Sequence, residues 1–225
     1  MPVACRSLLI CCVCATWGLL ASAARAEERV TLLDHRGPTG MVGRWSALTR
    51  PGIAGIPQPV KLSLPSTGTV TFYSGSPQNP VPLAAPSLTA LGVGYVYRVK
   101  ISEMPEFPGV ELYPTVELVD RLHPPAGLEL EFPVPLQITA EEIETVLQDR
   151  MVTKVVYLEQ PDLAYPAEQT QGPRIENLPP TVNLLHAADL RGRPMAIIRI
   201  GGRIPDPQSI SDEFFSKSPL QILRR

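Results

Sequence analysis

Proline is the residue type that most constrains what this chain can fold into. The 225 residues include 26 prolines, more than twice the usual share of about 5%. Because proline fixes φ and has no backbone N–H, it is hard to place in helix interiors or in central strands. We therefore expect short strands, sheet edges that carry proline, and many rigid loops.

Alternating apolar and polar residues predict a series of short strands between the prolines. The predicted strands are 60–64, 68–73, 94–102, 110–122, 128–138, 152–158 and 195–200. In the segment 94–102 the alternation places Tyr95 and Tyr97 on the same face as Val99, which favours packing of both rings in the core. Pro133 and Pro135 favour an edge position for the segment 128–138.

Two short helices are predicted among these strands. Thr139 has the properties of an N-cap, and Glu142 follows at the spacing of a capping box, so the first helix spans about 139–148. The second covers 184–190 and ends at Gly192. A turn of helix is also expected around 212–217.

This order of elements predicts a mainly β fold, an antiparallel β-sandwich of immunoglobulin-like type with one or two short helices. The strand, helix and strand across 136–158 resemble the corner at which such sandwiches cross between sheets. The alternative is an α+β fold, in which the helix at Leu184 packs between the strands at Val152 and Met195. The predicted organisation is a signal peptide at 1–26, an irregular Gly/Pro-rich arm at 27–59, one mainly β domain at 60–205 and a C-terminal tail at 206–225.

The first 26 residues have the composition of a cleavable secretory signal peptide. Arg6 precedes an uncharged apolar run at 8–24, and Ala24-Arg25-Ala26 fits the small-x-small pattern, which predicts a cut before Glu27. A retained membrane anchor and a lipid-modified cysteine are the alternatives. All four cysteines lie within this segment, so cleavage would leave no thiol, and no later run is long enough to span a membrane.

No complete catalytic motif follows the predicted cut. The sequence has no H-E-x-x-H, G-x-S-x-G or phosphate-binding loop, and its three histidines lie in separate predicted elements. Asp120 and His123 are the most suggestive pair, but on a strand this spacing places them on opposite faces. The sequence therefore predicts no catalytic residue, no metal site and no cofactor. A hydrolase site assembled from distant residues stays open as an alternative.

Binding is the remaining class of function. The chain has a formal net charge of −2, so it lacks the excess of basic residues with which nucleic-acid-binding proteins neutralise phosphates. Exposed aromatic rings can stack on sugars or anchor a protein partner. The arginines concentrated between 191 and 203 could meet an anionic envelope component, although a solvated face explains them better. The candidate binding residues are Trp45, Tyr113, Arg193 and Arg203.

Several segments together carry a family resemblance. They are Gly94-Tyr95-Val96-Tyr97-Arg98, Phe107-Pro108-Gly109-Val110-Glu111-Leu112-Tyr113-Pro114-Thr115, Asp120-Arg121-Leu122-His123-Pro124-Pro125, Val152-Thr153-Lys154-Val155-Val156-Tyr157-Leu158-Glu159 and Gly192-Arg193-Pro194-Met195-Ala196-Ile197. Over residues 40–205 the chain resembles an uncharacterised family of exported proteins from planctomycete-type bacteria. The resemblance implies export and one continuous domain, and it implies no activity or catalytic residue.

The sequence as a whole predicts a noncatalytic exported protein, periplasmic or at the cell surface. We expect it to be a structural or protein-binding component of the bacterial cell envelope, with an envelope protein or polysaccharide as its partner. A carbohydrate-binding module is the second hypothesis, and an envelope hydrolase is the third.

Overall fold

A computed structural model of the protein describes residues 33–74, 76–160, 162, 174–206, 208, 214–215 and 218–223. They belong to one compact unit, Leu33–Arg225. The predicted signal peptide at 1–26 and most of the predicted helical turn at 212–217 lie outside the described residues.

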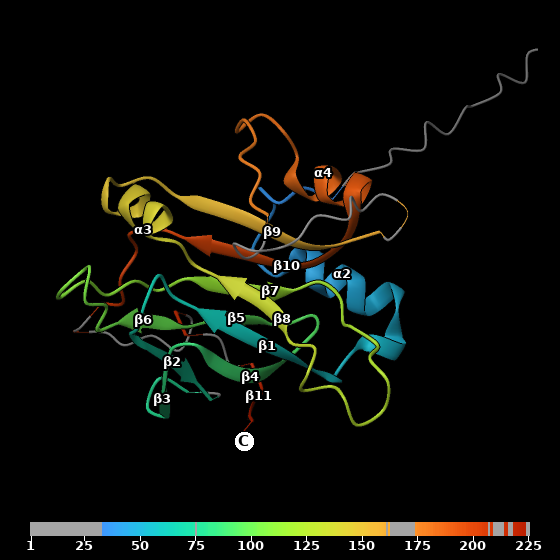
Figure 1. The fold of residues 1–225 in the computed structure, drawn as a ribbon, viewed down its shortest axis with the longest axis horizontal. Helices are drawn as coiled ribbons and strands as arrows, with labels where there is room; N and C mark the ends of the chain where they lie inside the picture. The colour runs from blue at the N-terminus through green and yellow to red at the C-terminus, as the bar shows by residue number, and fades with distance from the viewer. Residues whose placement is uncertain are drawn as a thin grey trace, which may run out of the picture. The chain divides into compact units, whose positions relative to one another are not determined.

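The first sheet has the strand order β11-β4-β1-β8 (Figure 1). Its strands are β1 (Pro57–Ser63), β4 (Ser87–Gly92), β8 (Val134–Gln137) and β11 (Leu220–Ile222). Strand β1 pairs antiparallel with β4 and parallel with β8. Strand β8 is an edge strand, as Pro133 and Pro135 predicted.

The other two sheets are antiparallel throughout. The second has the order β5-β7-β10-β9 and the third the order β3-β2-β6. The second sheet is formed by β5 (Val96–Arg98), β7 (Thr115–Leu118), β9 (Val152–Glu159) and β10 (Gly192–Ile200). The third is formed by β2 (Thr69–Tyr73), β3 (Pro80–Ala84) and β6 (Lys100–Ser102).

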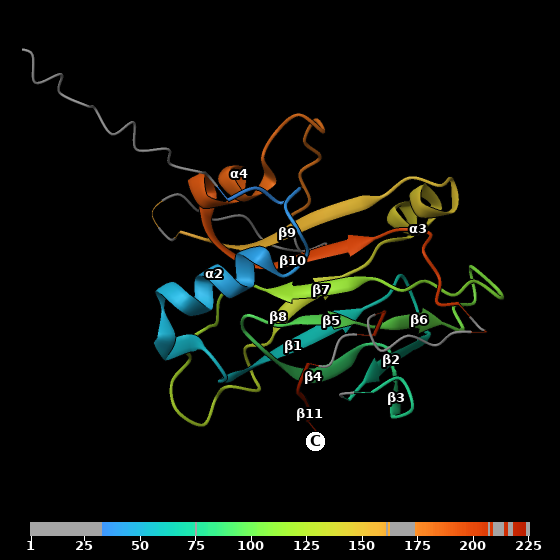
Figure 2. The same ribbon diagram turned by 180° about the vertical axis from the view of Figure 1, so that it is seen from behind.

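Within the described residues, three short α-helices and one 3-10 turn accompany the sheets (Figure 2). They are α2 (Met41–Thr49), the 3-10 turn η2 (Pro51–Ile53), α3 (Ala140–Leu147) and α4 (Leu184–Arg191). Helix α3 connects β8 in the first sheet to β9 in the second. Helix α4 precedes β10 and packs on β9 and β10. The prediction of a mainly β protein with short helices is confirmed.

One hydrophobic core joins side chains from all three sheets. Val60 and Leu136 come from the first sheet, Leu118 and Ile198 from the second and Phe72 from the third, and each is at most 1% exposed. At about 25 cal/mol for each Å² of apolar surface removed from water, burial of these side chains is the main favourable contribution to folding. The three sheets therefore stabilise one another through a shared core.

The arm predicted as irregular contains α2, so that prediction was wrong for Met41–Thr49. Gly40 precedes the helix in a left-handed conformation, and no side chain of the helix's own segment caps it. The helix lacks acidic residues in its first turn, where they would indicate a helix start. Its first N–H groups bind a carboxylate that lies far away in the sequence, and this contact has no local signal.

Two predicted strands are shorter than expected, and each begins directly after a proline. Of the segment 110–122, only Thr115–Leu118 forms a strand, and it begins directly after Pro114. Of the segment 128–138, only Val134–Gln137 does so, and it begins directly after Pro133. A residue without an N–H cannot donate to the ladder.

The predicted strand 94–102 is divided between two sheets. It breaks at Val99 into β5, which pairs with β7, and β6, which pairs with β2. Gly94, with φ +90°, turns the chain before β5. Tyr97 is therefore 3% exposed in the core, whereas Tyr95 stays outside the strand and is 40% exposed. The predicted core position was correct for Tyr97 and wrong for Tyr95.

The capping box predicted for α3 is present, and its contribution to stability can be tested. The Thr139 hydroxyl accepts a hydrogen bond from the Glu142 N–H at 3.3 Å, and the Glu142 carboxylate accepts one from the Thr139 N–H at 2.9 Å. We expect Thr139→Ala to lower the free energy of unfolding by about 1 kcal/mol in urea titrations. Thr145→Ala, within the same helix, removes no cap and should change it by less than about 0.5 kcal/mol. Equal losses for the two variants would contradict the role of the cap.

Candidate functional site

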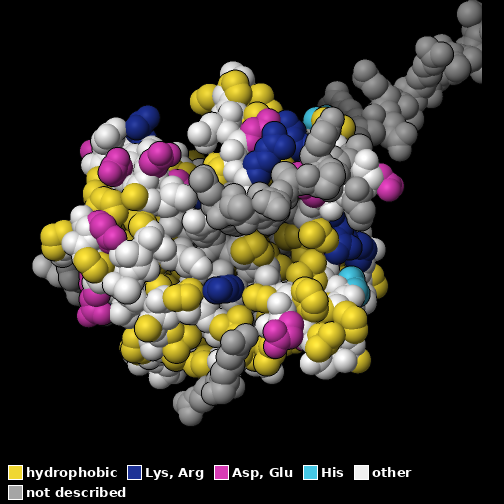
Figure 3. Space-filling view, in the orientation of Figure 1, with side chains coloured by type: hydrophobic (Ala, Val, Ile, Leu, Met, Phe, Trp, Pro, Cys, Tyr) yellow, Lys and Arg dark blue, Asp and Glu magenta, His cyan; other side chains and the backbone are white. Residues whose placement is uncertain are grey.

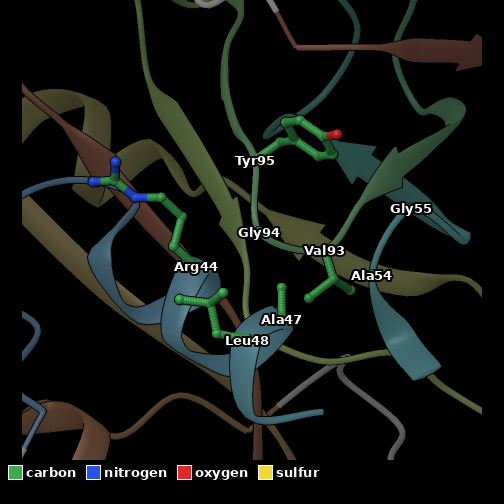
Figure 4. Close-up of a pocket in the computed structure, with 8 residues that line it drawn as sticks. All are labelled: Arg44, Ala47, Leu48, Ala54, Gly55, Val93, Gly94 and Tyr95. Carbon is green, nitrogen blue, oxygen red and sulfur yellow. The ribbon is translucent and has the colours of Figure 1, made fainter. Parts of the chain in front are cut away.

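A hollow of about 280 Å³ lies between α2 and the turn that joins β4 to β5 (Figure 4). Arg44 and Leu48 line it from α2, and Tyr95 lines it from the turn. Figure 4 shows Arg44 and Tyr95 on opposite sides of the hollow, with small and aliphatic side chains between them. The lining is mainly apolar and carries one permanent charge.

Two glycines allow α2 to lie directly against the sheet. A Cβ on Gly43 would lie 2.6 Å from the Leu118 carbonyl oxygen. A Cβ on Gly94 would lie 3.0 Å from the Ala47 Cβ, and its φ of +90° also disfavours any other residue. Both contacts fix the helix beside the turn, so the walls of the hollow are held by backbone packing.

The outward side of α2 carries two large apolar side chains. Val42, Gly43 and Ser46 are buried against the sheet, which turns the opposite side of the helix to solvent. Trp45 is 52% exposed and Leu48 is 74% exposed. We call the surface formed by these two residues with Arg44 and Tyr95 the α2 face.

Arg44 is the charged group of the α2 face. Its Nε donates a hydrogen bond to the Gly40 carbonyl oxygen at 3.0 Å. Within the described part of the chain, its guanidinium forms no ion pair with a carboxylate. The group is thus oriented by the helix and has donors left for a ligand. Tryptophan, tyrosine and arginine are the residue types enriched among the energetically dominant contacts of protein interfaces.

A buried carboxylate holds α2 in place. Glu117 on β7 is 0% exposed. Its oxygens accept hydrogen bonds from the N–H groups of Gly40 at 2.9 Å and Gly43 at 2.8 Å, and Arg199 binds it at 2.9 Å. A negative charge at a helix N-terminus is favourable because it meets unpaired N–H groups and the positive end of the helix dipole. Glu117 therefore replaces the cap that the helix's own sequence lacks.

A second buried carboxylate binds the end of the same segment. Asp120 is 1% exposed, and it pairs with Arg50 at 2.6 Å and with Arg193 at 3.4 Å. It also accepts a hydrogen bond from the Arg121 N–H at 2.8 Å. The His123 side chain is exposed, and among the described contacts of Asp120 there is none to it. The structure therefore gives no support to an Asp120–His123 pair.

The four residues predicted for binding lie in three different places. Trp45 belongs to the α2 face, and Arg193 pairs with Asp120. Tyr113 and Arg203 both contact the Phe214 ring, with centroid distances of 5.5 Å for the Tyr113 ring and 5.6 Å for the Arg203 guanidinium carbon. Tyr113 is only 8% exposed, and burial together with Glu111 raises its pKa. It is thus a packing residue of an aromatic cluster.

The arginines between 191 and 203 do not form one free basic patch. Arg191 pairs with Glu176 at 2.6 Å, and Arg199 pairs with buried Glu117. Because these charges are neutralised within the protein, they offer little to an anionic ligand. Sequence reasoning missed Arg44, Leu48 and Tyr95. The spacing of Arg44 and Leu48, four residues apart, becomes informative only once a helix is assigned there.

Two other features are absent from the part of the chain that the structure describes. It holds no group of three or more histidine, cysteine, aspartate or glutamate side chains placed to bind a metal ion. None of its helices has the length and the apolar character needed to cross a membrane.

Comparisons of the chain with protein-family models, with curated proteins and with solved structures give no match.

His35, which precedes α2 in the chain, should make the free energy of unfolding depend on pH. His35 is 8% exposed, and its Nδ1 accepts a hydrogen bond from the Leu184 N–H at the start of α4. That bond requires an unprotonated Nδ1. The Asp34 carboxylate, 3.0 Å from Nδ1, favours the protonated form, but burial is the larger effect and lowers the pKa of His35 below 6.5.

The unfolded chain therefore binds this proton more readily than the folded protein does. As pH falls below about 6.5, the free energy of unfolding should decrease, until the folded-state pKa is passed. We expect His35→Gln to remove this component, so urea titrations between about pH 7 and pH 5 should give a shallower dependence than wild type. If the free energy of unfolding of wild type and of His35→Gln depended on pH in the same way, this role of His35 would be contradicted.

Proposed function

We propose that this chain is a noncatalytic exported protein that binds another polypeptide of the cell envelope through the α2 face. The observation that carries the proposal is the exposure of Trp45 and Leu48 on a helix that buried Glu117 fixes to the sheet. Because these contacts already fix the helix backbone, the backbone loses little conformational freedom when a partner covers the two side chains. Arg44 and Tyr95, on either side of the hollow, supply a charged and an aromatic contact.

A noncatalytic role agrees with the use of the buried acids. A hydrolase site in this region would use the carboxylates of Glu117 and Asp120. Both carboxylates are already bound by backbone N–H groups and arginines of the protein. Their contacts position α2 and the residues that follow it. They act as supports of the binding surface.

We also propose the immunoglobulin-like sandwich for the two four-stranded sheets. Its support is the common core of the β1 and β7 sheets and the crossing of the chain between them through α3. The packing of α4 on β9 and β10 is the feature that the α+β alternative predicts. Export rests on the signal-peptide pattern of residues 1–26 and on the family resemblance.

Crosslinking in envelope fractions, followed by mass spectrometry, tests the proposed function. We expect one polypeptide to be joined to the protein in reproducible yield, and the protein itself to begin at Glu27. Recovery of the protein with no specific partner would contradict the binding role, and a retained N-terminal segment would contradict cleavage.

A glycan array separates this proposal from a carbohydrate-binding module. Exposed Trp45 and Tyr95 could also stack on sugar rings. We expect a flat array, because the hollow is lined mainly by apolar side chains and offers few hydrogen-bonding groups for hydroxyls. Saturable glycan binding that is lost in Trp45→Ala would contradict a polypeptide partner and would indicate a polysaccharide instead.

A further inference from the structure

A second and larger hollow lies on the outward side of the first sheet. Its volume is about 670 Å³, within the range of roughly 300–1,000 Å³ typical of small-molecule sites. Strands β1, β3 and β4, the loop before β8 and the end of β11 contribute to its walls. Figure 3 shows hydrophobic side chains gathered over β1, β4 and β8 on this side of the molecule.

Among the described residues that line this hollow, Lys61 is the single basic one. It lies in the middle of β1, where its neighbours in register are Leu88 on β4 and Pro135 on β8. Among the described residues, its ammonium has no ion pair or hydrogen bond. Glu131 in the loop also lines the hollow, and the two side chains form no ion pair with each other. Lys61 is solvent-exposed, so its ammonium is available to one anionic group of a ligand whose apolar part lies along the leucines of the hollow.

Three of the residues that line the hollow are prolines. Pro82, Pro86 and Pro133 are among the lining residues, and none of them has a backbone N–H. A buried peptide would leave its own backbone groups without partners there, at a cost for each group. A hydrocarbon chain has no such groups. The three positions without an N–H donor therefore favour an acyl chain over a polypeptide.

From these features we infer that the larger hollow binds an anionic amphiphile with one apolar chain, such as a fatty acid, whose carboxylate meets the Lys61 ammonium. The acyl chain lies against Leu83, Leu88 and Leu130. This site is separate from the α2 face, so it can hold its ligand whether or not a polypeptide is bound there.

Calorimetric titration of the purified chain with dodecanoate and with 1-dodecanol tests this inference, since the two probes share a chain and differ in charge. We expect saturable binding of dodecanoate at one site, weakened about tenfold in Lys61→Met because a charge-assisted contact is lost. Binding of 1-dodecanol should change less than about twofold. Leu88→Gln should weaken binding of both probes.

Lys100→Met is the matched control, because Lys100 pairs with Glu111 at the surface outside the hollow. It should leave both affinities unchanged, with an unaltered thermal midpoint confirming that each variant is folded. The inference is overturned if wild type binds no dodecanoate saturably or if Lys61→Met weakens both probes equally. It is also overturned if an uncharged apolar peptide binds the hollow more tightly than dodecanoate does.

Discussion

Replacing Glu117 by glutamine should lower the free energy of unfolding by about 3 to 5 kcal/mol. The carboxylate is fully buried, and its removal leaves the Arg199 guanidinium, itself only 11% exposed, without its counter-charge. The N–H groups of Gly40 and Gly43 also lose a charged acceptor. The loss should be seen in urea titrations as a lower midpoint with an unchanged slope.

Glu111→Gln is the matched control for this effect. Glu111 also pairs with a cation, Lys100, but its side chain is 50% exposed, and such surface pairs contribute about 0 to 1 kcal/mol. Trp45 gives a local readout, since the other tryptophan, Trp17, lies in the predicted signal peptide. In Glu117→Gln the Trp45 fluorescence should change before global unfolding. Equal stability of the two variants would mean that Glu117 does not hold α2.

The second large effect concerns binding. Leu48→Glu should weaken binding of the envelope partner by about 2 kcal/mol, or roughly 30-fold, because it places a charge at the centre of the proposed interface. The side chain is 74% exposed, so the free energy of unfolding should change by less than about 0.5 kcal/mol. Surface plasmon resonance with the crosslinked partner measures the first quantity, and urea titration measures the second.

Met151→Glu provides the comparison for Leu48→Glu. Met151 is 71% exposed and directly precedes β9. The start of β9 lies beside α3 and away from α2 in both views of the ribbon (Figures 1 and 2). Met151→Glu makes the same change in net charge as Leu48→Glu, at a side chain of similar exposure. The Met151→Glu variant should bind the partner as wild type does. Equal weakening by the two substitutions would indicate a general effect of charge and would contradict an interface at α2.

The elements that the sequence predicted well are those with local causes. The start of α3 follows from the reciprocal bonds of Thr139 and Glu142, and the edge position of β8 follows from its prolines. The side chain of Tyr97 is buried as the alternation in β5 requires. In each case the residues that determine the structure lie within a few positions of one another.

The parts that escaped prediction depend on contacts between distant residues. Helix α2 lies in a segment of glycine and proline, and Glu117, 77 residues from Gly40 in the sequence, supplies its missing cap. The α2 face could not be recognised before that helix was known, so only Trp45 of its residues was predicted. Tyr113 and Arg193 were chosen for their chemistry, but the fold uses them for packing and for an internal ion pair.

Site-specific photocrosslinking in the cell envelope tests most directly whether the α2 face binds the partner. A photoreactive amino acid is introduced at position 48, and separately at position 151, in the otherwise unchanged protein. We predict that position 48 gives a strong crosslink to the same polypeptide found in envelope fractions, and that position 151 gives little or none. A strong crosslink at 151 with none at 48 would contradict the proposed binding face.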